Sequence, residues 1–231
     1  MKKLNWFLSK FNTLETIDWG IYSNTHLDMG CGNSPRNPFF AKNLIGADIL
    51  DPDILNVAGE FTYLRIDLSG HIPLETKSID SISGYDFLEH LPRGASVESN
   101  LFIRFMNEAS RILKDGGVLM LVTPAFPSSA AFQDPTHVNF ISEETINYFI
   151  GHNPDAKNLG YGFEGSFKLL SQEWVGPLSK VWSKTFDLQV SQGKKSARFQ
   201  FFKNFSSIRA TRRTISAIRK PTHLLWLLQK I

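Results

Sequence analysis

The 231-residue sequence predicts an α/β fold built on one largely parallel sheet. Three short apolar segments, at residues 25–29, 44–49 and 62–66, are each followed closely by an acidic residue or a glycine turn. A helical pattern of apolar residues at 96–113 leads into the almost wholly apolar segment 118–122, which is typical of a strand buried on both faces. The length suits a single domain with a sizeable core.

The composition is that of an ordinary globular protein, with 42% hydrophobic and 20% charged residues. Cys31 is the only cysteine, so no disulfide framework is expected and a reducing compartment is favoured. The first residues lack the apolar stretch of a secretory signal, and no run approaches the ~18 apolar residues of a membrane span. We therefore expect a cytoplasmic protein.

The net charge of +3 hides an asymmetry along the chain. No acidic residue follows Asp187, whereas residues 191–231 contain ten lysines and arginines, which leaves the rest of the chain acidic. We expect residues 176–220 to form a basic helical insertion between the last two strands. Such a segment could contact an anionic membrane surface, bind an acidic glycan, or simply cover the sheet.

The stretch T-H-L-D-M-G-C-G-N-S at residues 25–34 predicts a strand that ends in a glycine turn. Gly30 and Gly32 can adopt positive φ and let backbone N–H groups approach a ligand closely. A turn of this kind at the carboxyl edge of an open α/β sheet is the usual place for a nucleotide-like ligand. A dinucleotide is disfavoured, because Pro35 replaces the third glycine of its motif and Asp28 would lie close to the phosphates.

This stretch resembles motif I of the class I S-adenosylmethionine-dependent methyltransferases, an acidic residue followed by G-x-G-x-G. Asp28, Gly30 and Gly32 match the motif, and Ser34 stands in place of its last glycine. The sulfonium and α-amine of S-adenosylmethionine tolerate a nearby carboxylate. The resemblance implies this cofactor and a Rossmann-like sheet of seven strands, the seventh antiparallel between the fifth and sixth, with helices on both faces.

Further motifs follow in the order that the family has. Asp48 ends the second strand, where an acidic residue suits hydrogen bonding to ribose hydroxyls. The resemblance implies that Asp67 and Leu68 face the adenine, and that the segment D-F-L-E-H-L-P at 86–92 lines the sulfonium and the acceptor. The predicted cofactor-binding residues are Asp28, Gly30, Cys31, Gly32, Asp48, Ile49, Asp67, Leu68 and Asp86.

The second half of the chain completes the predicted sheet. The phrase E-A-S-R-I-L-K-D-G-G-V-L-M-L-V-T-P at 108–124 resembles the family's unit of a helix, two glycines and strand five. We place Lys114 in the last helical turn and the helix stop at Gly116 and Gly117. Residues 167–175 and 223–231 are predicted as strands six and seven, residues 1–24 as a helical lead-in, and Ser142 as the cap of a further helix.

The candidate catalytic residues lie in the segment D-P-T-H-V-N-F at 134–140, in the loop after strand five. His137 can act as a general base near neutral pH. Asp134 could orient His137 or hold a divalent cation such as Mg²⁺, and the sequence leaves the need for a metal open. His90 is the second choice for the base.

The segment after strand four also bears on the acceptor. It lacks the Asn-Pro-Pro-aromatic tetrad that is typical of amine or nucleic-acid-base methylation, which favours an oxygen acceptor. The run D-P-T-H-V-N-F-I-S-E-E-T resembles methyltransferases of bacterial glycan and polysaccharide assembly, which implies O-methylation of a sugar hydroxyl. Two alternatives remain open: a lipid or quinone-like acceptor, and a catalytically silent cofactor-binding partner subunit.

Overall fold

A computed structural model describes residues 23–55, 61–68, 70–94, 96, 100–176 and 221–231. The predicted lead-in at 1–24 lies outside these residues apart from its last two, and the predicted basic insertion at 176–220 lies outside them apart from its first. Both therefore stay predictions.

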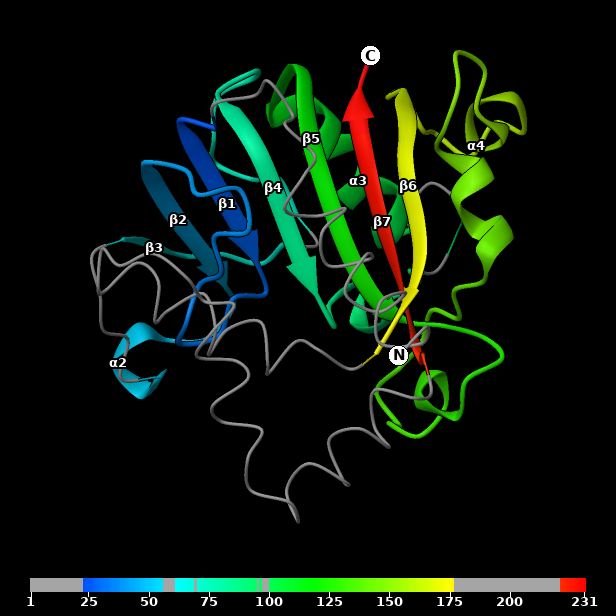
Figure 1. Cartoon of the computed structure of the whole chain (residues 1–231), viewed down its shortest axis with the longest axis horizontal. Coiled ribbons are helices and arrows are strands. Elements are labelled where there is room, and N and C mark those ends of the chain that lie inside the picture. The colour runs from blue at the N-terminus through cyan, green and yellow to red at the C-terminus, as the bar shows by residue number, and fades with distance from the viewer. Residues whose placement is uncertain (1–22, 56–60, 69, 95, 97–99, 177–220) are drawn as a thin grey trace, which may run out of the picture.

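The centre of the molecule is one seven-stranded sheet in the order β3-β2-β1-β4-β5-β7-β6 (Figure 1). Only β7 runs antiparallel to its neighbours, β5 and β6, which confirms the predicted Rossmann-like topology. The predicted strands agree with the structure to within a residue or two, except that β5 begins earlier. The bounds are β1 Thr25–Met29, β2 Asn43–Asp48, β3 Thr62–Arg65, β4 Ile79–Tyr85, β5 Leu113–Pro124, β6 Phe167–Val175 and β7 His223–Lys230.

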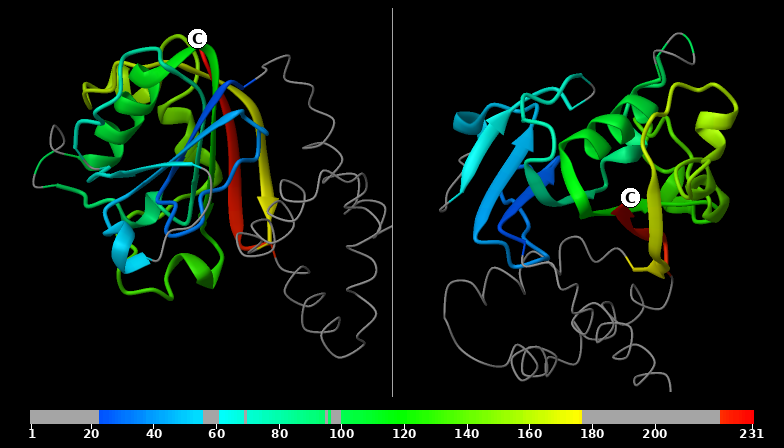
Figure 2. Two further views of the ribbon diagram at one scale, coloured as in Figure 1. Left: turned by 90° about the vertical axis from the view of Figure 1, so that its left-hand side faces the viewer. Right: turned by 90° about the horizontal axis from the view of Figure 1, so that it is seen from above.

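The main described helix is α3, Leu101–Ile112, which lies with α4 on one face of the sheet (Figure 2). It begins five residues later than predicted, because the side chain of Asn100 caps it by accepting hydrogen bonds from the N–H groups of Phe102 and Ile103. The shorter helices are α2 Pro52–Leu55, η1 Leu88–His90, η2 Ser129–Ala131, η3 Glu143–Tyr148 and α4 Asp155–Asn158. Among the helices that the structure describes, none has the length and apolar content needed to cross a bilayer.

Two local predictions were wrong. The helix stop is at Ile112 rather than at Gly116 and Gly117, because Leu113 already has extended geometry and starts β5. Lys114 therefore belongs to the strand, where its ammonium group lies 2.7 Å from Asp80 Oδ1. Ser142 is the N-cap of the following helix, as predicted, and this helix, η3, is a 3-10 helix. Residues 35–42, all of them described, contain no helix.

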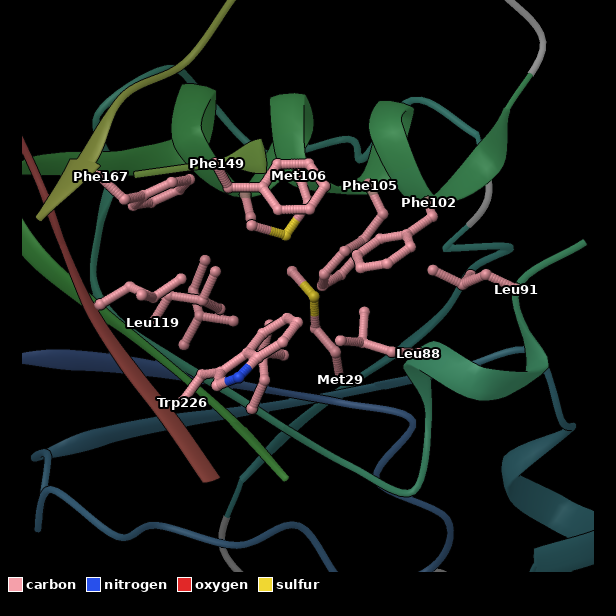
Figure 3. Close-up of a cluster of buried hydrophobic side chains, with 14 of the residues drawn as sticks. Met29, Leu88, Leu91, Phe102, Phe105, Met106, Leu119, Phe149, Phe167 and Trp226 are labelled. Atoms are coloured by element: carbon pink, nitrogen blue, oxygen red, sulfur yellow. The ribbon is translucent and has the colours of Figure 1, made fainter. Parts of the chain in front are cut away.

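The core lies between α3 and the sheet (Figure 3). Phe102, Phe105 and Met106 point from α3 toward Met29 of β1 and Trp226 of β7, and all five side chains are buried. The residues Leu88 and Leu91, from the segment after β4, pack in the same cluster. The core therefore anchors the loops at the carboxyl ends of β1 and β4.

Candidate active site

The glycine turn after β1 has the backbone geometry that its sequence predicted. Gly30 and Gly32 have φ of 66° and 58°, in the left-handed region where glycine is favoured. The N–H of Gly30 donates to the carbonyl of Ala47 at 2.8 Å, which ties the turn to β2. A Cβ atom at Gly32 would meet nothing within 4 Å in the described part of the chain, so the turn faces open space there.

Asp48, at the end of β2, closes the other side of this turn. Its carboxylate accepts hydrogen bonds from the N–H of Gly32 at 2.9 Å and from the N–H of Leu50 at 3.0 Å. Each oxygen retains acceptor capacity, which a pair of ribose hydroxyls can use. The neighbouring Ile49 is 61% exposed and offers an apolar surface beside the carboxylate.

Asp28 is fully buried and both its oxygens are bonded. Oδ1 accepts from the hydroxyl of Ser83 at 2.5 Å, and Oδ2 accepts from the N–H of Arg36 at 2.8 Å. Burial raises the pKa of Asp28 to about 6, while these two hydrogen bonds act in the opposite direction. Through its hydrogen bond to the N–H of Arg36, Asp28 therefore holds the segment that follows the glycine turn.

His26 belongs to the same buried network, a contact that sequence reasoning missed. Its Nε2 lies 2.9 Å from the oxygen of Ser83, and its Nδ1 lies 2.7 Å from that of Ser81. Because Ser83 gives its proton to Asp28, it accepts from Nε2–H, and Nδ1 then accepts from Ser81. Burial lowers the pKa of His26 to about 3, which keeps the ring neutral in this arrangement.

The remaining predicted cofactor residues have different surroundings. Cys31 is buried, and burial raises the pKa of its thiol to about 12, so the side chain has a packing role. Asp67 is exposed after β3, and the neighbouring Leu68 is buried in the main core. The carboxylate of Asp86 lies 3.1 Å from Nε2 of His223, at the start of β7.

Two segments meet at the carboxyl ends of β4 and β5. The carbonyl of Glu89 in η1 accepts hydrogen bonds from the N–H groups of Val138 and Asn139, at 2.8 and 3.1 Å. The side-chain amide of Asn139 donates in turn to the carbonyls of Leu88 and Leu91. This pairing fixes the predicted catalytic segment against the residues that follow β4.

The pairing brings His90 and His137 together, with ring centroids 4.8 Å apart. The carboxylate of Asp134 accepts its hydrogen bonds from Thr136, whereas its backbone carbonyl accepts from the N–H of His137 at 3.2 Å. Asp134 Oδ1 accepts from the hydroxyl of Thr136 at 2.7 Å, and that hydroxyl lies 3.0 Å from Nδ1 of His90. Nδ1 of His137 lies 3.2 Å from the carbonyl of Ala131.

These partners define the tautomers of the two rings. A carbonyl can only accept, so Nδ1 of His137 carries its hydrogen. The hydroxyl of Thr136 gives its single proton to Asp134, so Nδ1 of His90 also carries a hydrogen. Each neutral imidazole is thus left with a lone pair on Nε2. Burial lowers the pKa of His90, and the nearby His137 adds to this effect, which favours the neutral form.

Glu89 is the functional candidate that the sequence did not single out, although it stands within the E-H pair of the segment after β4. The residue is 1% exposed. Its Oε2 accepts from the hydroxyl of Thr123 at 2.9 Å, and its Oε1 has no hydrogen-bond partner among the described residues. Burial raises the pKa of Glu89 to about 7, and the charges of Asp86 and Asp134 add to the shift.

Exposed aromatic side chains lie in the same loop. Three of them are about half exposed, and we call them the aromatic platform: Phe126 at 56%, Phe132 at 52% and Phe140 at 50%. The rings of Phe132 and Phe140 stack with centroids 5.0 Å apart, and the guanidinium of Arg93 lies 5.6 Å from the centre of the Phe140 ring. Large apolar groups left in water in this way indicate a binding surface.

Comparison with known proteins places the segment that contains the glycine turn within a described domain. Residues 27–121 match a family model described as a methyltransferase domain. The matched segment runs from β1 through most of β5 and contains all the predicted cofactor residues. No curated protein matches the chain.

Solved structures share the fold. A methyltransferase–activator complex from Haloferax volcanii, of Trm112 with a candidate methyltransferase, has a TM-score of 0.54 at 13% identity, with 99% of this chain and 91% of that chain covered. An S-adenosylmethionine-dependent methyltransferase from Archaeoglobus fulgidus has a TM-score of 0.52 at 19% identity, with 96% and 93% covered. At these identities the likeness establishes the fold.

The residues present fit the cofactor of such an enzyme. The open space at Gly32 admits a ligand against the backbone, Asp48 retains acceptor capacity for hydroxyl groups, and Ile49 offers an apolar surface. The class that the fold, the family match and this site support is a methyltransferase that uses S-adenosylmethionine. The predicted enzyme class and cofactor are therefore confirmed.

Proposed function

We propose that this methyltransferase acts on a hydroxyl group of a sugar or glycan. The observation that carries the proposal is the pair His90 and His137, whose rings lie 4.8 Å apart. His137 belongs to the loop after β5 that also carries the aromatic platform. The imidazoles suit a hydroxyl that must lose a proton, and the platform suits an acceptor ring.

The residues of the chain divide into two groups. Asp48 and the glycine turn bind the cofactor, whose positively charged sulfur supplies the methyl group and leaves as a neutral thioether. The acceptor oxygen forms its bond to the methyl carbon as its proton is lost at the His90–His137 pair. Alignment of the two reactants is the main contribution of such a site, and the proton acceptor adds to it.

The aromatic platform favours a sugar over a long lipid chain. A pyranose has a face of C–H groups that packs flat on an aromatic ring, and its hydroxyls need polar neighbours. Arg93 supplies a positive charge over the Phe140 ring, and Asp134 supplies a negative charge in the same loop, close to His90 and His137. A purely apolar acceptor would leave these charged groups facing hydrocarbon, which is unfavourable.

The test is methyl transfer from labelled S-adenosylmethionine to pools of sugar, glycan, lipid and quinone acceptors. We expect incorporation into the sugar or glycan pool. His137→Ala and His90→Ala should each lower kcat by about 10²- to 10⁴-fold, the usual worth of a general acid–base group. His152→Ala, an exposed histidine in the loop after η3, is the matched control.

The outcomes separate the alternatives. Incorporation of the label into the lipid or quinone pool alone would show that the acceptor is a lipid or quinone and not a sugar. Cofactor binding without transfer to any pool would favour the silent partner subunit. Near-full turnover in both histidine variants would remove the pair from the reaction.

A further inference from the structure

We propose that Glu89, His90 and His137 bind a divalent transition metal ion. The binding itself is independent of the proposed function. The role that we give the ion, activation of the acceptor hydroxyl, rests on that function.

The first support is geometric. One ligand-capable atom from each of the three residues can be chosen so that all lie within 4.8 Å of one another. Zn²⁺ binds imidazole nitrogen and carboxylate oxygen at about 2.0–2.2 Å in tetrahedral geometry, so two of its ligand atoms lie about 3.3–3.6 Å apart. Side-chain movements that bring the three atoms up to about 1.5 Å closer together therefore close the site.

The second support is the orphan oxygen of Glu89. Oε1 is buried without a hydrogen-bond partner in the described part of the chain, whereas the carboxylates of Asp28 and Asp48 each have both oxygens bonded. A buried carboxylate oxygen without a partner costs the full desolvation of that atom. A bound cation would supply the missing partner.

The third support is the set of groups that hold the three side chains. Metal-binding histidines characteristically donate their other ring N–H to an oxygen, which fixes the ring. Nδ1 of His90 has the Thr136 hydroxyl and Nδ1 of His137 has the Ala131 carbonyl, so Nε2 of each ring is left to bind the ion. Glu89 is held in the same way by Thr123.

The ligand types indicate which ions would bind. Two imidazoles and one carboxylate favour Zn²⁺, Co²⁺, Fe²⁺ or Ni²⁺ over Mg²⁺, which prefers an all-oxygen shell. Three protein ligands also leave at least one position open, as in catalytic rather than structural zinc sites. The nearby carboxylates of Asp86 and Asp134 add negative charge that attracts a cation.

The open position defines the role of the ion. A hydroxyl bound there loses its proton more readily, because the ion stabilises the negative oxygen. The proton goes to solvent, the bond from oxygen to the methyl carbon forms, and the bond from that carbon to sulfur breaks. The histidines then hold the ion and need not accept the proton themselves.

The experiment measures Co²⁺ binding to the chelator-treated full chain, without cofactor or acceptor, by equilibrium dialysis and by visible absorption. We expect one Co²⁺ per chain and absorption bands in the visible region. Glu89→Gln and His90→Ala should each weaken binding at least 10-fold, since loss even of a supporting contact costs about 10- to 100-fold. His152→Ala should bind as the unchanged protein does.

Folding is checked separately by circular dichroism, and His90→Ala keeps the test valid if Glu89→Gln fails to fold, because His90 is exposed. The absence of stoichiometric Co²⁺ binding, or binding that neither substitution weakens, would overturn the proposal. In that event a loss of turnover in His137→Ala would still support the proposed function, with the imidazole acting directly as base.

Discussion

The two ends of the site differ in how their polar groups are satisfied. On the cofactor side, the chain from Ser81 through His26 and Ser83 to Asp28 is buried, and every member has a hydrogen-bond partner. On the proposed acceptor side, Glu89 has a buried oxygen without a described partner, and the loop that carries His137 also carries exposed aromatic rings. The first arrangement stabilises the folded chain, whereas the second leaves binding capacity unused for a ligand.

The largest effect is expected from Ser83→Ala, which removes the central hydroxyl of the cofactor-side network. The substitution leaves one oxygen of Asp28 without its donor and Nε2–H of His26 without its acceptor. Two buried groups then lack partners, so unfolding in urea at pH 8 should show a loss of about 2–4 kcal/mol. Ser78→Ala, a residue bonded to the carbonyl of Glu75 near the surface, is the control and should change stability little. Equal effects in the two variants would contradict the importance of the network.

Asp48→Ala is expected to act on cofactor affinity. Loss of hydrogen bonds to a charged group costs about 1.5–3 kcal/mol, or about 10- to 100-fold in the dissociation constant of S-adenosylmethionine. Calorimetry measures this directly. The control is Asp51→Ala, three residues later, whose carboxylate pairs with the exposed Arg65 at 2.7 Å. Unchanged affinity in Asp48→Ala would remove that residue from the ribose site.

The pH dependence of stability should reveal the two buried titratable groups of the network. The pKa of His26 is about 3 in the folded chain, against an ordinary value of 6.5, so the unfolded chain binds more protons between these values, and stability falls as pH falls. The pKa of Asp28 is about 6 when folded against 3.8, so the folded chain binds more protons in that window, and stability rises as pH falls. The two effects oppose each other between pH 6 and pH 4.

Asp28→Asn should remove one of the two opposing effects. Without the carboxyl group, the histidine acts alone, and stability should fall by about 1 kcal/mol more than in the unchanged protein between pH 6 and pH 5. Urea unfolding at both pH values gives the change in the free energy of unfolding between pH 6 and pH 5. A loss of stability that is the same at both pH values does not affect this change. Parallel slopes in the two proteins would show that the two groups do not oppose each other as proposed.

The smallest effect on stability is expected on the acceptor side. Phe132→Ala removes an exposed ring, so the free energy of unfolding should change by no more than about 0.5 kcal/mol. The KM for the acceptor should rise by about 3- to 10-fold, in line with the ~0.5–1.5 kcal/mol of an aromatic contact, while cofactor affinity stays the same. Leu159→Ala, exposed at the end of α4, is the control. An unchanged KM would exclude the Phe132 ring from acceptor binding.

The sequence by itself determined the strands and the glycine turn, whereas the place of the seventh strand in the sheet was implied by the resemblance to the methyltransferase family. These features depend on short-range patterns: apolar runs define buried strands, and positions such as Gly30 and Gly32 need a backbone that other residues rarely adopt. Asp48 could be placed for the same reason, because the end of a strand is visible in the sequence.

Only the tertiary structure decided which side chains meet. The partners of His26 come from the parallel register of β1 and β4, which sets His26 opposite Ser81 and Asp28 opposite Ser83. The cluster of Glu89, His90 and His137 needs η1 and the loop after β5 to pair through the carbonyl of Glu89. The hydrogen bonds between the Asp134 carboxylate and Thr136 were not predicted for the same reason. Contacts between segments distant in sequence depend on register and packing, and neither leaves a periodic signal in the chain.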